Sequence, residues 1–166
     1  MKKQDIWFLG IVSVLFLIGF FVVSLLEESQ KTGEIYAKVF YRDTLVLMID
    51  LQTNEYVVYN TPYTTQVDTG RASEGIFYVP GTTTTSMDNL YQIDAYAAQN
   101  QIVGIKLIVE QNKIRIGYQE SPRDLCEMQS PTDSRMRPLV CLPNELLVSV
   151  YTNLTSEDFI PDAILE

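Results

Sequence analysis

Two cysteines are the residues of this sequence with the clearest capacity for chemistry. Cys126 and Cys141 are the only cysteines in a chain of 166 residues, and the sequence contains no histidine. Without histidine, neither a Ser–His nor a Cys–His nucleophile can form. A zinc site is also disfavoured, because two thiolates need further ligands and only Asp124 or Asp133 could join them.

The spacing of the cysteines favours a structural disulfide over a redox-active pair. They lie 15 positions apart, and closing a loop of this size stabilises a fold by about 3 kcal/mol in the chain-entropy model. A redox pair is typically C-x-x-C, with a lowered thiol pKa. We therefore predict a Cys126–Cys141 disulfide, as expected for an even cysteine count outside the cytoplasm.

Other reactive groups do not suggest a site. Paired carboxylates could act as acid and base, but spacing does not bring together any two of Asp88, Asp94, Asp124 and Asp133, so a solvated acidic face is the preferred interpretation. Threonines at 69 and 82–85 only faintly resemble a flavin attachment sequence. We predict no catalytic, metal-binding or cofactor-binding residue, and no cofactor.

Composition indicates one folded, acidic domain. Apolar residues make up 46% of the chain, which is enough for a core in a domain of this size. The net charge is −9; Lys2 and Lys3 against Asp5 give the first 26 residues +1, which leaves −10 on the remainder. Such a surface repels phosphate backbones, so nucleic acid is not expected as a partner.

Residues 6–26 are expected to form a transmembrane helix. These 21 residues carry no charge, and a helix of this length covers roughly 31 Å, close to the hydrocarbon thickness of a bilayer. The two lysines precede the segment, and Glu27 and Glu28 follow it. The positive-inside rule then predicts a single-pass protein of the cell membrane, with a cytoplasmic N-terminus and an extracellular C-terminal domain.

Three alternatives exist for this segment. A cleaved signal peptide has a shorter apolar region and small residues at the cleavage site, whereas this run is longer and ends L-L-E-E-S-Q. A lipoprotein signal requires a cysteine near the end of the run, and none is there. A buried core helix is disfavoured because every face is apolar and Trp7 lies near one end. We favour the uncleaved anchor.

The remainder of the chain has the alternation and turn signals of strands. The fold class predicted is all-β: a small antiparallel barrel or sandwich-like domain preceded by the transmembrane helix. Asn112 is expected in a left-handed turn between two of the strands. The predicted strands cover 35–41, 44–50, 55–59, 75–79, 90–96, 102–110, 113–118 and 146–151, the last within an apolar run that begins near Cys141.

The resulting organisation has five parts. Residues 60–89 interrupt the domain as an irregular, threonine-rich insertion, which we interpret as solvated loop; a modification or binding surface is the alternative. The parts are a cytoplasmic stub at 1–5, the helix at 6–26, a linker at 27–33, the β-domain at 34–153 and an acidic tail at 154–166.

Three motifs resemble the bacterial NusG domain II family of small β-domains, many of which follow one transmembrane helix. They are N-K-I-R-I at 112–116, S-P-R-D-L-C at 121–126 and V-C-L-P-N-E-L-x-V-x-V at 140–150. The resemblance covers roughly 102–151, with 37–59 fitting the family's first strands more loosely. The residues that carry the motif are Asp124, Cys126, Cys141, Leu142, Pro143 and Asn144.

The sequence departs from the family pattern at two places. Ser121 occupies the position of the family's first cysteine, and Glu127-Met128-Gln129 stands where a glycine is usual. The resemblance implies a membrane-anchored, non-enzymatic interaction or accessory module, with an envelope or membrane protein as its partner. The alternative that it implies is an accessory component of an extracytoplasmic redox or flavin-linked electron-transfer system.

Overall fold

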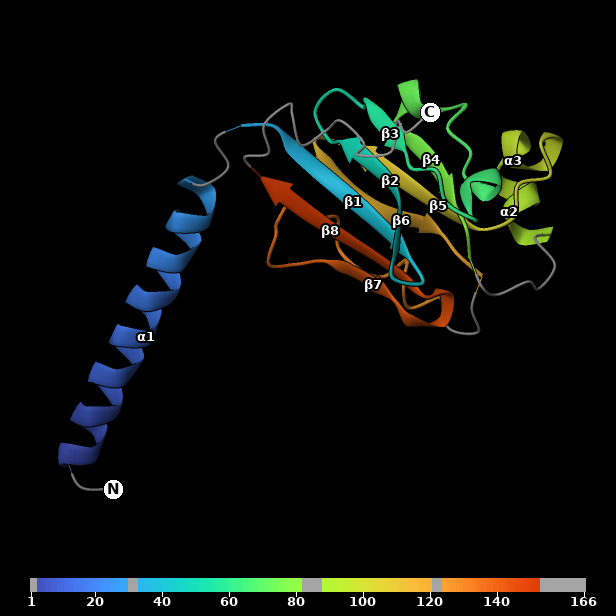
Figure 1. Cartoon of the computed structure of the whole chain (residues 1–166). Coiled ribbons are helices and arrows are strands. Elements are labelled where there is room, and N and C mark those ends of the chain that lie inside the picture. The colour runs from blue at the N-terminus through green and yellow to red at the C-terminus, as the bar shows by residue number, and fades with distance from the viewer. Residues whose placement is uncertain (1–2, 30–32, 82–87, 121–123, 153–166) are drawn as a thin grey trace. The chain divides into compact units, whose positions relative to one another are not determined.

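The structure is a computed structural model of the whole chain (Figure 1). It describes residues 3–29, 33–81, 88–120 and 124–152. The chain divides into two compact units, Met1–Thr32 and Gly33–Glu166. Each unit is described by itself.

The first unit contains one helix, α1 (Lys3–Ser29). Side chains of α1 are described without interruption over 10–23, and all of them are exposed. Among the residues that the structure describes, no helix is both long and apolar enough to cross a membrane.

The second unit is built on a five-stranded antiparallel sheet with the order β3-β2-β1-β8-β7 (Figure 1). β1 lies at its centre, paired with β2 on one side and with β8 on the other. The β1–β2 hairpin has a two-residue turn, and a bulge shifts the register after Val39. The five strands are β1 (Ile35–Tyr41), β2 (Thr44–Asp50), β3 (Tyr56–Val58), β7 (Leu139–Cys141) and β8 (Leu146–Thr152).

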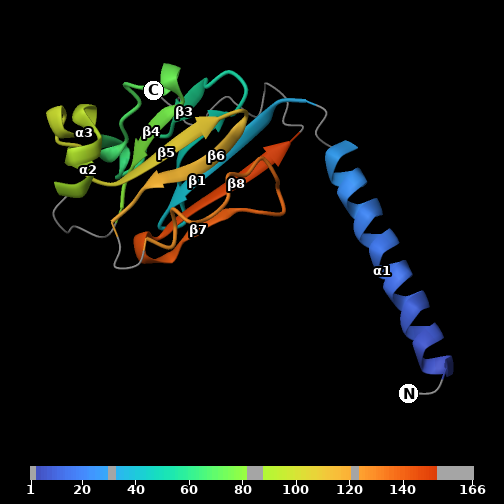
Figure 2. The same cartoon turned by 180° about the vertical axis from the view of Figure 1, so that it is seen from behind.

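A second antiparallel sheet has three strands in the order β4-β5-β6 (Figure 2). They are β4 (Ile76–Val79), β5 (Ile105–Glu110) and β6 (Lys113–Tyr118). Gln111 and Asn112 turn the β5–β6 hairpin with φ of 53° and 60°. The left-handed conformation predicted for Asn112 is therefore confirmed, and it extends to its neighbour.

One hydrophobic core unites the two sheets. Alternate residues of β1 and β8 enter the same buried cluster as Phe77, Leu107 and Ile116 of the three-stranded sheet. The period-2 alternation of the sequence produces this arrangement, because every second side chain of a half-buried strand faces the core. The domain is thus mostly β, with two packed sheets, and it is not a closed barrel.

Most predicted strands are present. The bounds predicted for β1, β2 and β6 agree with the structure. β5 begins three residues later than predicted, because Gly104 has a φ of +140° and its position lies against the carbonyl of Val79. The apolar run after 139 is divided by the 3-10 helix η3 (Leu142–Asn144) into β7 and β8.

The strand predicted over 90–96 is wrong. This segment forms two short helices, α2 (Asp88–Ile93) and α3 (Ala95–Gln99). Buried residues recur at Leu90, Asp94 and Ala97, a spacing of four and three that suits a helix. The Asp94 carboxylate caps α3 by accepting a hydrogen bond from the backbone N–H of Ala97.

The predicted insertion at 60–89 contains more structure than a solvated loop. It holds two 3-10 helices, η1 (Thr64–Gln66) and η2 (Ala72–Glu74), as well as β4 and the start of α2. The threonine run at 82–85 and the tail at 154–166 lie outside the described residues.

Candidate functional site

The predicted disulfide is confirmed, and it lies in the core. Cys126, in the loop after β6, is bonded to Cys141, the last residue of β7, and their Cα atoms are 5.3 Å apart. Cys141 is fully buried and Cys126 is 3% exposed. The bond therefore fixes the loop after β6 to the edge of the five-stranded sheet.

Asn144 connects the segment around the disulfide to the end of β6 through buried hydrogen bonds. The residue is buried, with an exposed fraction of only 1%. The amide nitrogen donates to Oε1 of Gln119 at 2.9 Å and to the carbonyl oxygen of Glu120 at 3.3 Å. A Cβ atom at Gly81 would lie 2.9 Å from the amide oxygen of Asn144, so that position accommodates only glycine without displacement. Within the C-L-P-N motif, asparagine thus has an internal, structural role.

Glu127 contributes a half-buried carboxylate to the same region. Its Oε1 atom accepts a hydrogen bond from the backbone N–H of Gln119 at 2.8 Å. Burial raises the pKa of Glu127, and the negative charges of Asp124 and Glu120 raise it further, whereas the Gln119 N–H lowers it. The net shift is upward, because the buried negative charge is only partly compensated.

Leu142 has the opposite exposure within the same motif. It is 80% exposed, although it stands between the buried Cys141 and the buried Asn144. Pro143 lies in the first turn of η3, where its fixed φ suits the helix. Glu145 ends η3 with a φ of 51°. This short turn places an apolar side chain in solvent, at the start of β8.

An apolar row crosses the outer face of the five-stranded sheet next to Leu142. Strand register places Val140 opposite Leu147, Leu147 opposite Phe40, and Phe40 opposite Leu45. Side chains that are directly opposite on one face of a sheet contact each other. Val140 is 41% exposed and Leu147 is 37% exposed. This row of the outer face is therefore apolar across four neighbouring strands, where a solvated sheet is normally polar.

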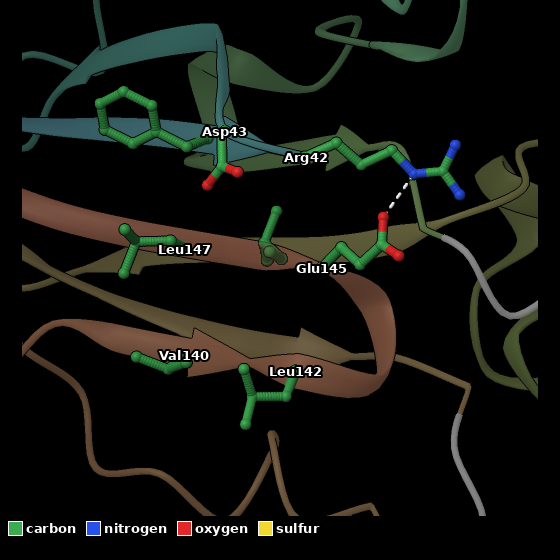
Figure 3. A pocket seen from close by; sticks show the side chains of 8 residues that line it. Arg42, Asp43, Val140, Leu142, Glu145 and Leu147 are labelled. Atoms are coloured by element: carbon green, nitrogen blue, oxygen red, sulfur yellow. Dashed lines mark hydrogen bonds and ion pairs between the residues drawn. The ribbon is translucent and has the colours of Figure 1, made fainter.

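A surface groove of about 600 Å³ lies on this row (Figure 3). Val140, Leu142 and Leu147 line it, and the guanidinium of Arg42 forms an ion pair with Glu145 at one end. The Glu145 carboxylate raises the pKa of Arg42. The backbone N–H of Arg42 also donates to the carbonyl of Glu145 at 3.0 Å. Two turns are thus held together at the rim of an apolar groove.

Tight turns form this rim. Arg42, Asp43 and Glu145 have φ of 49°, 58° and 51°, the left-handed conformation that also occurs in the turn of the β5–β6 hairpin. We identify the groove as the candidate functional site because it combines an exposed apolar row with an ion pair at its rim.

The edge of the sheet below the groove is closed by a side chain. Gln129 donates through Nε2 to the carbonyl of Val140 at 2.8 Å and accepts from its N–H at 3.0 Å. The amide side chain replaces a neighbouring strand, so β7 does not offer these groups for pairing with another chain. Binding at this site would use the apolar face and not the strand edge.

A second polar site lies on the other sheet, around Asp94. Its side chain is 1% exposed and forms ion pairs with Lys106 and, at 3.3 Å, with Arg71. The hydroxyl of Tyr78 donates to Asp94 at 2.8 Å. Burial alone raises the pKa of Asp94, but hydrogen bonds from Lys106, Tyr78 and the N–H of Ala97 outweigh it and lower the pKa overall.

The prediction of a solvated acidic face is thus wrong for Asp94. An aspartate directly before A-Y-A-A is a helix-capping signal, and that signal could have located this residue. The remaining contacts of the cluster hold α2 and α3 against β4 and β5. Since every charge in it is paired, we assign it to stability.

Other residues predicted from the sequence occupy ordinary positions. Asp124 is exposed with a φ of 49°, and Asp133 is half-buried. Ser121 lies outside the described residues, and the side chain of Asp88 is not described. Among the described residues, no group of three or more aspartate, glutamate or cysteine side chains could hold a metal ion.

Comparisons with known proteins add little. No family model matches the chain, and the comparison with curated proteins finds no match. One solved structure is similar: a DUF1312 family protein from Ruminococcus gnavus ATCC 29149. It shares 17% identity with a TM-score of 0.34, over 70% of this chain and 96% of that chain. The resemblance to NusG domain II stays a prediction.

Proposed function

We propose that this protein is a single-pass, membrane-anchored, non-enzymatic interaction module of an envelope complex, with its β-domain extracellular and similar to NusG domain II. The groove lined by Val140, Leu142 and Leu147 would bind an apolar segment of a membrane or envelope protein. The observation that carries this proposal is the 80% exposure of Leu142, an apolar side chain that lines the groove beside the exposed Val140 and Leu147.

The sequence of α1 supports anchoring. Its described side chains include Trp7, Phe16 and Phe20, which are 76%, 77% and 69% exposed. A helix with apolar side chains on every face needs an apolar surrounding. The charge-free run at 6–26 has the length that a bilayer requires, and its flanking charges orient the N-terminus to the cytoplasm.

The surface around the groove supports recognition of a protein segment. Exposed leucine and valine side chains offer apolar area, and the ion pair at the rim adds directional polar contacts. Interfaces have this composition, with an apolar centre and a polar rim.

The redox alternative is less well supported by the geometry. A thiol–disulfide exchange site needs a sulfur that an attacking thiolate can reach. Both cysteines are almost completely buried and their bond joins two structural segments. These features are those of a structural disulfide.

Photo-crosslinking of the full-length chain in its native membrane tests the proposal. A photoreactive phenylalanine derivative would replace Leu142 in one variant and Asn112, an exposed residue of the β5–β6 turn, in a matched control. We expect a discrete adduct from position 142 only, identified by mass spectrometry as a membrane or envelope protein. The substitution Leu147→Lys should abolish that adduct, because it places a charge in the groove.

Three results would overturn the proposal. Adducts of the same intensity from both positions would mean that the groove has no special affinity. An adduct that persists in Leu147→Lys would place the contact elsewhere on the domain. An adduct with the mass of two chains would identify a second copy as the occupant and would replace the envelope partner.

A further inference from the structure

The loop that leads into β7 combines basic and apolar exposed side chains. Arg135 and Arg137 are exposed, and Met136 between them is 71% exposed. In the described part of the chain, neither guanidinium forms an ion pair or hydrogen bond. Their charges are therefore available to an external anion.

The base of this loop is held in place. Thr132 bridges to Ile114 through two backbone hydrogen bonds of 2.9 Å. The backbone N–H of Met136 donates to the hydroxyl of Ser134 at 3.1 Å, and that of Arg137 to the carbonyl of Ser134 at 3.2 Å. These contacts hold the turn in which the three exposed residues lie.

Strand register places the loop at the end of the domain where β1 begins. Leu139 is opposite Val148 in an antiparallel pair, so the residues before Leu139 run towards Thr152. Thr152 is opposite Ile35, the first residue of β1. Figures 1 and 2 agree, since the loop before β7 lies beside the end of β8 in both views.

The stretch of sequence between α1 and this end of the domain is short. Five residues lie between Ser29, the last residue of α1, and Ile35, so six Cα–Cα steps join the two. Six steps of an extended chain reach at most about 22 Å. If α1 crosses a bilayer, as proposed above, this length of chain limits how far Ile35 can lie from the membrane surface.

The charge of the domain makes this loop distinctive. Residues 33–152 contain nine Lys or Arg and fourteen Asp or Glu, a net charge of −5. An anionic lipid surface would repel most of the domain. The loop is locally basic within this acidic domain. Its two arginine side chains can bind phosphate headgroups, and the exposed methionine between them can enter the boundary with the acyl chains.

We propose that the loop formed by Arg135, Met136 and Arg137 docks on anionic lipid headgroups and so orients the domain on the membrane. This proposal rests on the membrane anchoring proposed above. With the loop on the lipid, Leu142 at the opposite end of β7 would face away from the bilayer, towards a partner.

The test uses the full chain reconstituted into vesicles of phosphatidylcholine with or without phosphatidylglycerol. An environment-sensitive fluorophore is attached at Met136→Cys, or at Leu142→Cys as the matched control. Both are labelled without reductant, so that the disulfide stays closed. Quenching by lipids with a nitroxide on the headgroup then reports contact with the surface.

We expect strong quenching at position 136 in anionic vesicles and little at position 142. Adding Arg135→Gln and Arg137→Gln should lower the ratio of docked to undocked domain roughly 30-fold, which follows from the usual attraction of two basic residues to an anionic surface. Both arginines are exposed, so these changes should leave the unfolding temperature unchanged. The same loss is expected in vesicles of phosphatidylcholine alone.

Equal quenching at the two positions, or quenching unaffected by the arginine substitutions, would overturn the loop proposal. Extraction with alkaline carbonate separates this failure from failure of the anchor. A chain that stays in the vesicles without quenching at position 136 refutes only the loop. A chain that is washed off refutes the anchor, and the loop proposal falls with it.

Discussion

Replacing Asn144 should destabilise the domain far more than replacing its exposed neighbour Leu142. Asn144→Ala removes a buried amide that donates to the side chain of Gln119 and to the carbonyl of Glu120. Depriving a buried polar group of a partner costs about 1–3 kcal/mol. With one short and one longer hydrogen bond lost, we expect a decrease of about 2–4 kcal/mol in the free energy of unfolding.

The expected shift can be measured by thermal unfolding. A domain of this size loses roughly 4 °C in midpoint for each kcal/mol, so the midpoint of Asn144→Ala should fall by roughly 8–16 °C. All ten tyrosines lie at position 36 or beyond. Near-ultraviolet circular dichroism of tyrosine in the detergent-solubilised full chain therefore reports on the β-domain and not on α1.

Two control variants separate the possible causes. Leu142→Ala should change the free energy of unfolding by less than about 0.5 kcal/mol, because the side chain is exposed. Asn144→Asp keeps the volume of the side chain but loses both donated hydrogen bonds. It should be at least as destabilising as alanine. An aspartate variant with the wild-type midpoint would refute the reasoning, because packing and not hydrogen bonding would then fix the motif.

Four further outcomes follow from the structure. Replacing Cys126 and Cys141 with serine should lower the free energy of unfolding by about 3 kcal/mol in urea titrations. An unchanged midpoint would mean that the disulfide does not stabilise the domain. Gln129→Ala should expose the edge of β7 and cause concentration-dependent association in light scattering, whereas a monomeric variant would show that the edge is protected otherwise. Asp94→Asn should cost about 3–5 kcal/mol at pH 7, because its two cationic partners lose their buried counter-charge. Since the folded pKa of Asp94 is depressed, its contribution is complete above about pH 4 and is lost as the pH falls towards the folded pKa, so the difference between wild type and variant should shrink in acid. Glu127→Gln should raise the unfolding midpoint at pH 7, because the raised pKa of Glu127 means that its ionised form is disfavoured in the fold; this gain should vanish below about pH 4.5, and a gain that persists in acid would contradict it.

The sequence by itself determined those features that depend on local pattern. Alternating apolar residues gave the bounds of β1, β2 and β6, because a half-buried strand repeats every two residues. Asn112 predicted the turn between β5 and β6, since asparagine tolerates the left-handed conformation. With only two cysteines in the chain, the pairing of the disulfide had a single intramolecular solution.

Only the tertiary structure decided the features that join distant segments. The sequence predicts a surface position for Asp94. In the structure its carboxylate is buried, and Arg71 and Lys106 from other elements form ion pairs with it. Strand order and register, which the sequence does not reveal, align apolar residues of four strands into one row beside Leu142. The closure of β7 by Gln129 likewise joins residues that are 11 positions apart in the sequence, close to the Cys126–Cys141 disulfide. These contacts are long-range, so they cannot be predicted from local propensity and periodicity.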